Sequence, residues 1–159
     1  MPYRVFISYS GEDSKRVAQV RKALTAVGVE VYTYEEDPRP GAQLAEKVKN
    51  EIKRTDAVVV LLSEKGSRSA WVHQEIGCAE MAGKLVVPLV ESGTPESRLA
   101  LLNGREYVPY DPDAPGMALS KLTGFLGAKA GAKLTGQAIA VLAGVLIALL
   151  IVYLATREE

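Results

Sequence analysis

The chain has 159 residues, of which 48% are hydrophobic, and its 19 lysines and arginines balance 19 aspartates and glutamates. This balance leaves no field of one sign, so we expect no nucleic-acid partner. The single cysteine, Cys78, excludes an internal disulfide, and the single histidine, His73, argues against a histidine-based metal site, so we expect no metal.

The first elements alternate apolar runs with helical patterns. Residues 4–8 predict a strand, residues 10–13 a polar turn able to cap a helix, and residues 14–27 an amphipathic helix closed by Gly28. A second strand is expected over residues 29–33. Such a start is typical of an α/β domain.

A loop over residues 34–41 follows the second strand. Its two prolines and one glycine exclude regular structure, and its charged side chains have no core to enter. It is long for a strand-to-helix connection, and long loops often carry function. A solvated connection without function is the alternative.

The alternation continues to residue 127, and no apolar leader precedes the first strand. Strands alternating with helices of this length predict a flavodoxin-like, five-stranded parallel sheet of order 2-1-3-4-5, with helices on both faces. The remaining expected elements are a helix over 42–54, a strand over 57–62, a polar loop over 63–70, a helix over 71–83, a strand over 85–90, a short strand over 107–109 and a helix over 115–127.

Residues 134–156 contain no charged side chain. At about 1.5 Å per residue they form about 34 Å of helix, enough to cross a hydrocarbon core of about 30 Å. Lysines precede this segment, including Lys129 and Lys133, so the positive-inside rule predicts a tail-anchored protein with its domain in the cytoplasm. The expected organisation is a domain over 1–127, a linker over 128–133, a transmembrane helix over 134–156 and a tail over 157–159.

Small residues recur every four positions in this segment, at Gly136, Ala140, Gly144 and Ala148. Such a ridge lets two membrane helices approach closely, so self-association is one hypothesis. The alternative is that alanine and glycine are common in membrane helices generally.

Trp71 and Glu75 are the most informative pair of the soluble part. Residues four apart on a helix share a face, and this helix connects two buried strands, so both side chains can border the crevice at the carboxyl edge of the sheet. A packed ring beside a solvated charge is the alternative. Hydroxyl groups are expected near the same edge, from Ser8, Tyr9, Ser10, Ser63 and Ser69.

Several functions are excluded because the sequence lacks the residues that they require. The turn after the first strand has one glycine, which excludes a dinucleotide-binding or Walker-type loop, and the third strand ends without the aspartate of a phospho-receiver. Ser8 and Ser10 have no partner histidine nearby for a hydrolytic triad. One carboxylate, one ring and several hydroxyls suit cleavage of an N-ribosyl bond to cationic nicotinamide, because this base leaves neutral and needs no general acid. An aromatic ring stacked on the base contributes about 1–3 kcal/mol.

Four segments in register resemble a Toll/interleukin-1 receptor (TIR) domain, over about residues 3–127. The segments are Phe6-Ile7-Ser8-Tyr9-Ser10, Pro40-Gly41, Val58 to Ser63, and Trp71-Val72-His73-Gln74-Glu75-Ile76 with Gly83-Lys84 and Val87-Pro88.

The resemblance to the catalytic branch of this family implies that Glu75 cleaves NAD⁺ and that Trp71, Tyr9 and Ser10 border the substrate, with Ser8 and Ser63 close by. NAD⁺ is then substrate, and no cofactor is expected. Ser10 stands where some catalytic relatives have arginine, so Arg39 or Lys65 would have to contact a phosphate.

The resemblance also implies activation by self-association, in which the loop with Asp37, Pro40 and Gly41 helps to complete a neighbour's site. The main hypothesis is a membrane-anchored NAD⁺ glycohydrolase or ADP-ribosyl cyclase of prokaryotic antiphage defence. The alternative is a non-catalytic TIR scaffold. A third possibility is a nucleoside deoxyribosyltransferase-like enzyme, because Glu75-Ile76-Gly77-Cys78-Ala79 is also similar to that family's glutamate segment.

Overall fold

The computed structural model describes residues 1–34 and 44–155, with side chains as far as residue 148. Its centre is a parallel sheet of five strands in the order β2-β1-β3-β4-β5, which confirms the predicted flavodoxin-like topology. In chain order the strands are β1 (Tyr3–Ser8), β2 (Val29–Tyr32), β3 (Ala57–Leu62), β4 (Leu85–Glu91) and β5 (Val108–Tyr110).

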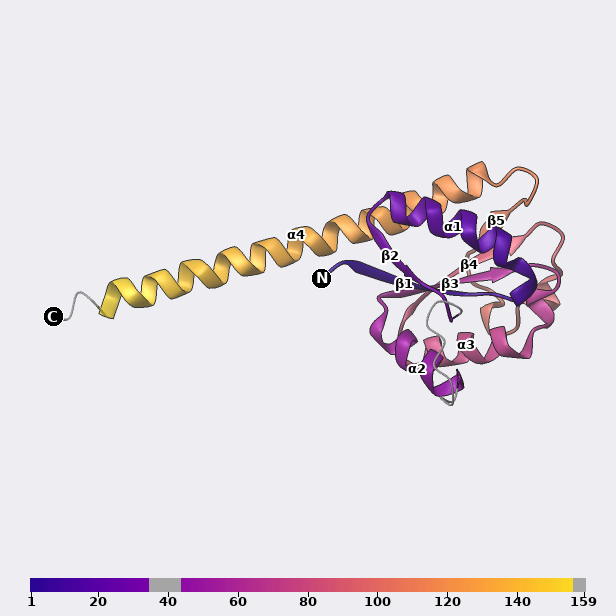
Figure 1. The fold of residues 1–159 in the computed structure, drawn as a ribbon, viewed down its shortest axis with the longest axis horizontal. Helices are drawn as coiled ribbons and strands as arrows, with labels where there is room; N and C mark the ends of the chain where they lie inside the picture. Colours follow the sequence, from indigo (N-terminus) through magenta and orange to yellow (C-terminus); the bar gives the residue numbers. More distant parts are fainter. Residues whose placement is uncertain (35–43, 156–159) are drawn as a thin grey trace.

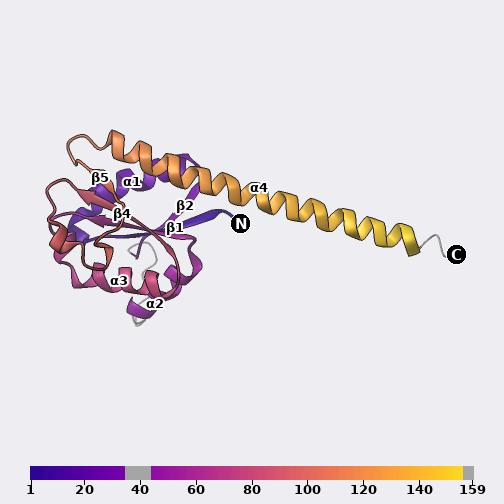
Figure 2. The same cartoon turned by 180° about the vertical axis from the view of Figure 1, so that it is seen from behind.

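Helices cover both faces of the sheet (Figure 1; Figure 2). α1 (Ser14–Ala26) and the first part of α4 (Gly116–Ala155) lie on one face, and α2 (Leu44–Arg54) and α3 (Ala70–Met81) on the other. Successive side chains of a strand point to opposite faces, so β3 contributes alternately to the two cores, and every residue of it is buried. Val59 and Leu61 pack under α1 and α4, while Val58, Val60 and Leu62 pack under α2 and α3.

The turn after β1 does not cap the following helix with a side chain, as the sequence had suggested. Residues Gly11–Asp13 form a 3₁₀ turn, and neither Ser10 nor Asp13 makes a side-chain cap hydrogen bond to the following helix. Asp13 is buried and binds elsewhere, as described below. Gly28, at φ 79°, lies in the left-handed region just after α1 and ends that helix as predicted.

Further 3₁₀ turns of the described chain were not expected from the sequence. They lie at Gly66–Arg68, Glu96–Arg98 and Ala100–Leu102. The predicted loop over residues 34–41 lies outside the described residues apart from Tyr34.

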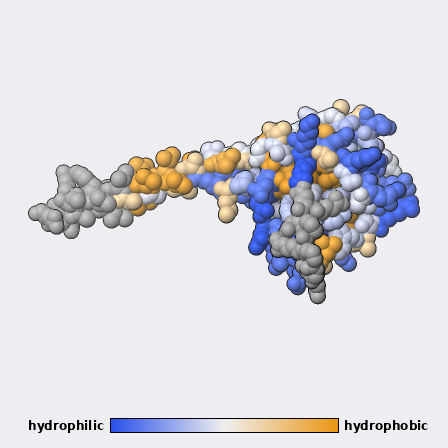
Figure 3. Space-filling model, viewed as in Figure 1, coloured by the Kyte–Doolittle hydropathy of each residue, from blue (hydrophilic) through white to orange (hydrophobic). Residues whose placement is uncertain are grey.

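α4 is a single helix of 40 residues. The predicted linker over residues 128–133 is part of it, and no proline separates the two halves. Ala118, Leu122, Leu126 and Ala130 are buried against the domain, whereas residues 138–148 project from it and are exposed. Figure 3 shows apolar side chains gathered on the projecting part and mainly hydrophilic ones over the domain. By length and composition, α4 is the one helix of the described chain that is able to cross a membrane.

Candidate active site

Glu75 lies in the second turn of α3, at the end of that helix nearest the carboxyl edge of the sheet. Ser69 caps the helix by accepting a hydrogen bond from the backbone N–H of Val72 at 3.4 Å. This start of α3 follows β3 after a short polar segment, so the fold turns the Glu75 side chain toward the ends of β1 and β3. The side chain is 2% exposed and therefore faces inward.

Ser8, the last residue of β1, is the hydrogen-bond partner of Glu75. Its hydroxyl donates to Glu75 Oε2 and is fully buried. Oε1 makes no hydrogen bond to any described residue. Among the described residues, the carboxyl group is therefore held through one oxygen only, and the other oxygen is buried without a partner.

Burial raises the pKa of Glu75 to about 7, because the charged form loses its hydration. The Ser8 hydroxyl opposes this rise by donating to the charged form. The Trp71 indole N–H lowers the pKa in the same way as a nearby donor, although its geometry falls short of a hydrogen bond to Oε1. Trp71 is partly buried against the core cluster under α2 and α3, one helical turn before Glu75. The predicted Trp71–Glu75 pair is therefore adjacent in space.

Two tyrosines that the sequence analysis did not single out as candidate site residues pack against the same cluster as Trp71. Tyr32, at the end of β2, stacks on Phe6 with ring centroids 5.9 Å apart, and Tyr34 packs beside it. The Tyr32 hydroxyl is buried without a described hydrogen-bond partner. The clue in the sequence was that β2 ends at the same edge of the sheet as β1.

Tyr9, predicted to border the substrate, is 2% exposed and belongs to the core cluster on the α1 and α4 face. The alternation along β1 places it opposite Ser8, so the structure does not bring its ring to Glu75. It stacks on Tyr34 with centroids 5.4 Å apart, and Tyr34 packs against both cores. Tyr9 therefore contacts a ring that packs against both core clusters.

Ser63 and Asp13 tie the ends of β1 and β3 together. Ser63 Oγ donates to Asp13 Oδ2 at 2.6 Å and accepts the backbone N–H of Gly66 at 2.8 Å. Both side chains are buried, and Arg16 donates to Asp13 Oδ1 at 3.0 Å. Ser10 is half-buried, and its carbonyl accepts the N–H of Asp13 at 2.8 Å. Ser63 is thus engaged with Asp13 rather than with Glu75, and Asp13 was missed because the sequence suggested a helix cap.

A charged hollow of about 330 Å³ adjoins this network at the carboxyl edge. Lys65 forms an ion pair with Glu12, and the hydrogen bond to Glu12 raises the pKa of Lys65. Arg16 pairs with Glu91 at 3.2 Å. The hollow therefore brings cations and carboxylates together, and both Lys65 and Arg16 are already engaged in ion pairs.

Some of the predicted residues lie outside the described part of the chain. Arg39 and the assembly-loop residues Asp37, Pro40 and Gly41 are outside the described residues. Within the described ranges, no group of three or more histidine, cysteine, aspartate or glutamate side chains can hold a metal ion. The small residues of the projecting helix, Gly136, Ala140, Gly144 and Ala148, are all exposed.

The strand order, with helices on both faces, defines a flavodoxin-like α/β domain, and Glu75 is buried at the carboxyl edge, where ligands usually bind in such folds. The family model described as "TIR domain" matches residues 5–123, and the chain belongs to this family. No curated protein matches the sequence significantly.

Solved structures share the fold. The TIR domain of the Toll-related receptor TRR-2 from Hydra magnipapillata has 19% identity and a TM-score of 0.64, covering 77% of this chain and 96% of that one. The CMP N-glycosidase BcmB from Clostridium botulinum has 23% identity and a TM-score of 0.60, covering 77% and 98%. The TIR domains of the activated Roq1 resistosome, which recognises the pathogen effector XopQ, have 21% identity and a TM-score of 0.52, covering 83% and 77%.

Proposed function

We propose that this protein is a membrane-anchored NAD⁺ glycohydrolase or ADP-ribosyl cyclase that is activated by self-association. The observation that carries the proposal is the buried Glu75 carboxyl group, held by Ser8 beside Trp71 at the carboxyl edge of the sheet. The similarity to a CMP N-glycosidase supports the broader class of N-glycosidic bond cleavage.

The proposed step breaks the bond between the ribose C1′ and the nicotinamide nitrogen. Nicotinamide leaves with the bonding electron pair and becomes neutral, while positive charge develops on the ribose. The ionised Glu75 carboxylate stabilises this charge, and Ser8 keeps the carboxylate oriented. Addition of water, with loss of its proton, gives ADP-ribose; attack by a nitrogen of the adenine base on the same carbon gives a cyclic product.

The cationic base of NAD⁺ also favours the ionised state of Glu75. An opposite charge within about 4–6 Å lowers the pKa of a carboxyl group. A group whose pKa is raised to about 7 by burial is therefore ready to ionise when this substrate binds.

Activation by self-association agrees with the closed state of the site. Glu75 is 2% exposed, so a substrate reaches it only after neighbouring segments move. Assembly through the TIR domains, with the loop over residues 35–41 as the contact, provides such a movement in the proposal. The resistosome neighbour contains assembled TIR domains, which supports the same mode here.

Anchoring is supported by α4. In its most apolar 18-residue window only 6% is buried inside the structure, whereas the core helix of a soluble protein is mostly buried. We propose that residues 134–156 span the membrane with the TIR domain in the cytoplasm, and that the protein acts in prokaryotic antiphage defence.

The test is chromatography of products after incubating the full chain, reconstituted in nanodiscs at high density, with NAD⁺. Nicotinamide is expected together with ADP-ribose or a cyclic isomer, and Glu75→Gln is expected to abolish it. Glu46→Gln, an exposed change on α2, is the matched control and should keep full activity. The enzymatic proposal is wrong if neither product forms at any density.

The same nanodisc samples distinguish two alternative functions from NAD⁺ cleavage. A non-catalytic scaffold would assemble in these nanodiscs without consuming NAD⁺. The CMP N-glycosidase neighbour favours a nucleotide other than NAD⁺, so CMP and a deoxynucleoside are incubated in parallel. Release of cytosine from CMP without nicotinamide release would identify the second alternative.

A further inference from the structure

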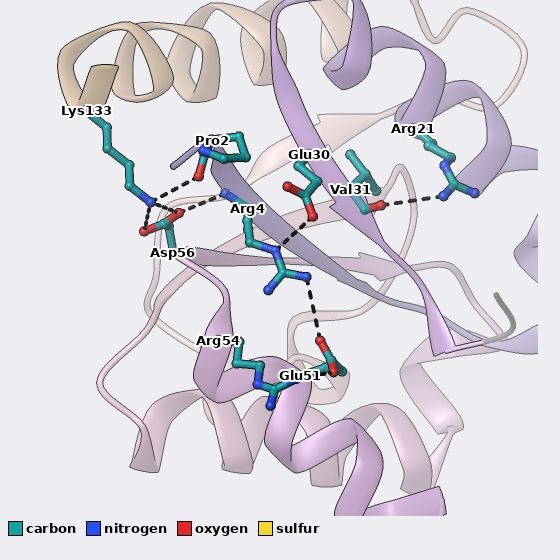
Figure 4. Close-up of polar contacts among 9 residues, drawn as sticks. All are labelled: Pro2, Arg4, Arg21, Glu30, Val31, Glu51, Arg54, Asp56 and Lys133. Atoms are coloured by element: carbon teal, nitrogen blue, oxygen red, sulfur yellow. Dashed lines mark hydrogen bonds and ion pairs between the residues drawn. The ribbon is translucent and has the colours of Figure 1, made fainter. Parts of the chain in front are cut away.

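The point where α4 leaves the domain is held by polar contacts (Figure 4). Lys133 Nζ binds both carboxylate oxygens of Asp56, at 2.6 and 2.8 Å, and the carbonyl of Pro2 at 3.1 Å. One turn further on, the amino group of Met1 donates to Gln137 Oε1 at 2.6 Å. These contacts bracket position 134, the first residue of the long uncharged segment. No spacer therefore separates the domain from that segment.

α4 leaves the domain beside the edge of the sheet at which the strands begin. β1 starts beside the root of α4, and the parallel strands all run away from it (Figure 1). The last turns of α2 and α3 reach the same edge, because each precedes the strand that follows it. We call this end the root face and define it by Met1, Lys53, Arg54, Met81, Lys84 and Lys129.

Most carboxylates of this end are already paired. Asp56 binds Lys133, and Glu30 binds Arg4 at 3.0 Å. Glu51 lies between Arg4, at 3.8 Å, and Arg54, at 3.3 Å.

The lysines of the root face are not neutralised by ion pairs. Within the described chain, Lys53, Lys84 and Lys129 form no ion pair, although Lys84 is close enough to Asp56 to contribute to lowering its pKa. Lys129 lies over the Phe125 ring, 5.2 Å from its centroid. Near the start of β5, Arg105 pairs with Glu80 at 2.7 Å, and Glu106 is an exposed carboxylate without an ion pair. The face therefore keeps an excess of positive charge.

Large apolar side chains are also exposed on this face. Met81, the last residue of α3, is 89% exposed, and Met1 is 87% exposed. Lysine stems and methionines around a positive surface suit the boundary between headgroups and acyl chains. A hollow of about 530 Å³ at the root, lined by Met1, Pro2, Arg4, Glu30, Arg54 and Lys133, adds space for a headgroup.

We infer that the root face docks on the lipid surface of the membrane in which α4 is anchored, with its free lysines against the phosphates of anionic headgroups. This inference rests on the proposed anchoring. It fixes the domain with Glu75 and the charged hollow at the edge that faces away from the membrane. Substrate and neighbouring TIR domains then approach from the aqueous side.

The test uses the full chain in nanodiscs, first of phosphatidylcholine and then with about a third phosphatidylglycerol. An amine-reactive reagent labels lysines, and mass spectrometry gives the rate at each position. In the anionic discs Lys53, Lys84 and Lys129 are expected to react about fivefold more slowly, which corresponds to the attraction of a cation to an anionic surface. Lys15, exposed at the far end of the domain, is the internal control and should not change.

A charge-reversed pair tests the surface directly. Lys53→Glu with Lys84→Glu should remove the protection of Lys129 in anionic discs, whereas Lys15→Glu should leave it intact. Loss of protection in high salt would support the same contact.

If the root-face lysines, like Lys15, react at the same rate in the neutral and the anionic discs, the docking is wrong but the anchor is unaffected. Extraction of the chain by alkaline carbonate, or failure to enter nanodiscs, would overturn the anchoring and the docking together. Activity toward NAD⁺ is measured separately and decides neither outcome.

Discussion

The ionisation of Glu75 couples the candidate site to the stability of the domain. Burial raises its folded-state pKa from 4.5 to about 7, so the folded protein holds this proton over a range where the unfolded chain has lost it. The free energy of unfolding therefore falls as the pH rises from about 4.5 to about 7, by about 3 kcal/mol at 1.36 kcal/mol per pKa unit. Above that range this contribution stays lost.

Denaturant unfolding of the full chain in mild detergent at several pH values checks this slope. Glu75→Gln keeps the volume and removes the titration, so the variant should lose most of the slope between these pH values. A slope that is unchanged in the variant would show that Glu75 ionises freely in the folded state.

Ser8 lowers the pH at which the Glu75 carboxyl group ionises. Its hydroxyl donates to the charged form, so Ser8→Ala should raise the pKa of Glu75 further, by about one to two units, as expected for loss of a hydrogen bond to a charged group. The pH profile of NAD⁺ cleavage should then shift upward by the same amount. Ser67→Ala, which removes a hydroxyl bound to the carbonyl of Glu64, is the control and should leave the profile in place.

The sequence predicted part of this site because two periodicities were visible in it. Spacing on a helix paired Trp71 with Glu75, and the end of a strand placed Ser8 nearby. Tyr9 was assigned to the same crevice although alternation along β1 turns it to the other face. The hydrogen bond between Ser63 and Asp13 joins residues 50 apart in the chain, and no local sequence pattern predicts such a contact.

At the scale of elements, the ion pair between Asp56 and Lys133 joins α4 to the start of β3. Partial burial raises the pKa of Asp56, but hydrogen bonds from Lys133 and from the backbone N–H of Arg4 outweigh it, and the net pKa is lowered. A lowered pKa means that this stabilisation is present above about pH 4 and is lost as the pH falls through the folded-state value.

Asp56→Asn should lower the free energy of unfolding by about 1 kcal/mol, the usual range for a partly exposed pair with good geometry. Amide hydrogen exchange over residues 129–137 should rise at the same time, because the root of α4 loses its main contact. A double-mutant cycle with Lys133→Met isolates the pair, and additive effects of the two changes would show that Asp56 acts only through the N–H of Arg4.

The regular elements were predictable because their signals are local. Fully apolar runs gave the buried strands, and glycines gave helix ends. The continuity of α4 was not recognised, since residues 128–133 consist of alanine and lysine with one glycine and lack an apolar face. Their helix is set by packing on one side, where Ala130 is buried, and by the Lys133 contact, both of which are tertiary.

At the scale of the whole molecule, one rigid helix connects the domain to the proposed membrane span. The packed part of α4 and the projecting part share one axis, so rotation of the span about its partner would turn the TIR domain with it. In the proposed arrangement, clustering in the membrane and assembly of the domains would therefore be coupled. The candidate assembly loop over residues 35–41 would meet its partner in an orientation that the span sets.

The ridge of small residues is the proposed contact for such a partner. Gly136, Ala140, Gly144 and Ala148 are exposed on the projecting helix, and close approach of two backbones requires small side chains there. Ala140→Leu should therefore reduce crosslinked dimers in membranes and lower NAD⁺ cleavage at a fixed protein density. Loss of one packed contact of about 1–2 kcal/mol corresponds to about a five- to thirtyfold weaker association.

Ala138→Leu is the matched control, because it makes the same change about 200° away around the helix and should leave both readouts unchanged. Insertion and expression are compared by alkaline extraction, so that a poorly inserted variant is not mistaken for a weak dimer. If Ala138→Leu and Ala140→Leu act alike, the ridge has no special role. If Ala140→Leu lowers crosslinking but not cleavage, TIR contacts alone drive assembly, and the rigid helix positions the domain without bringing its partner.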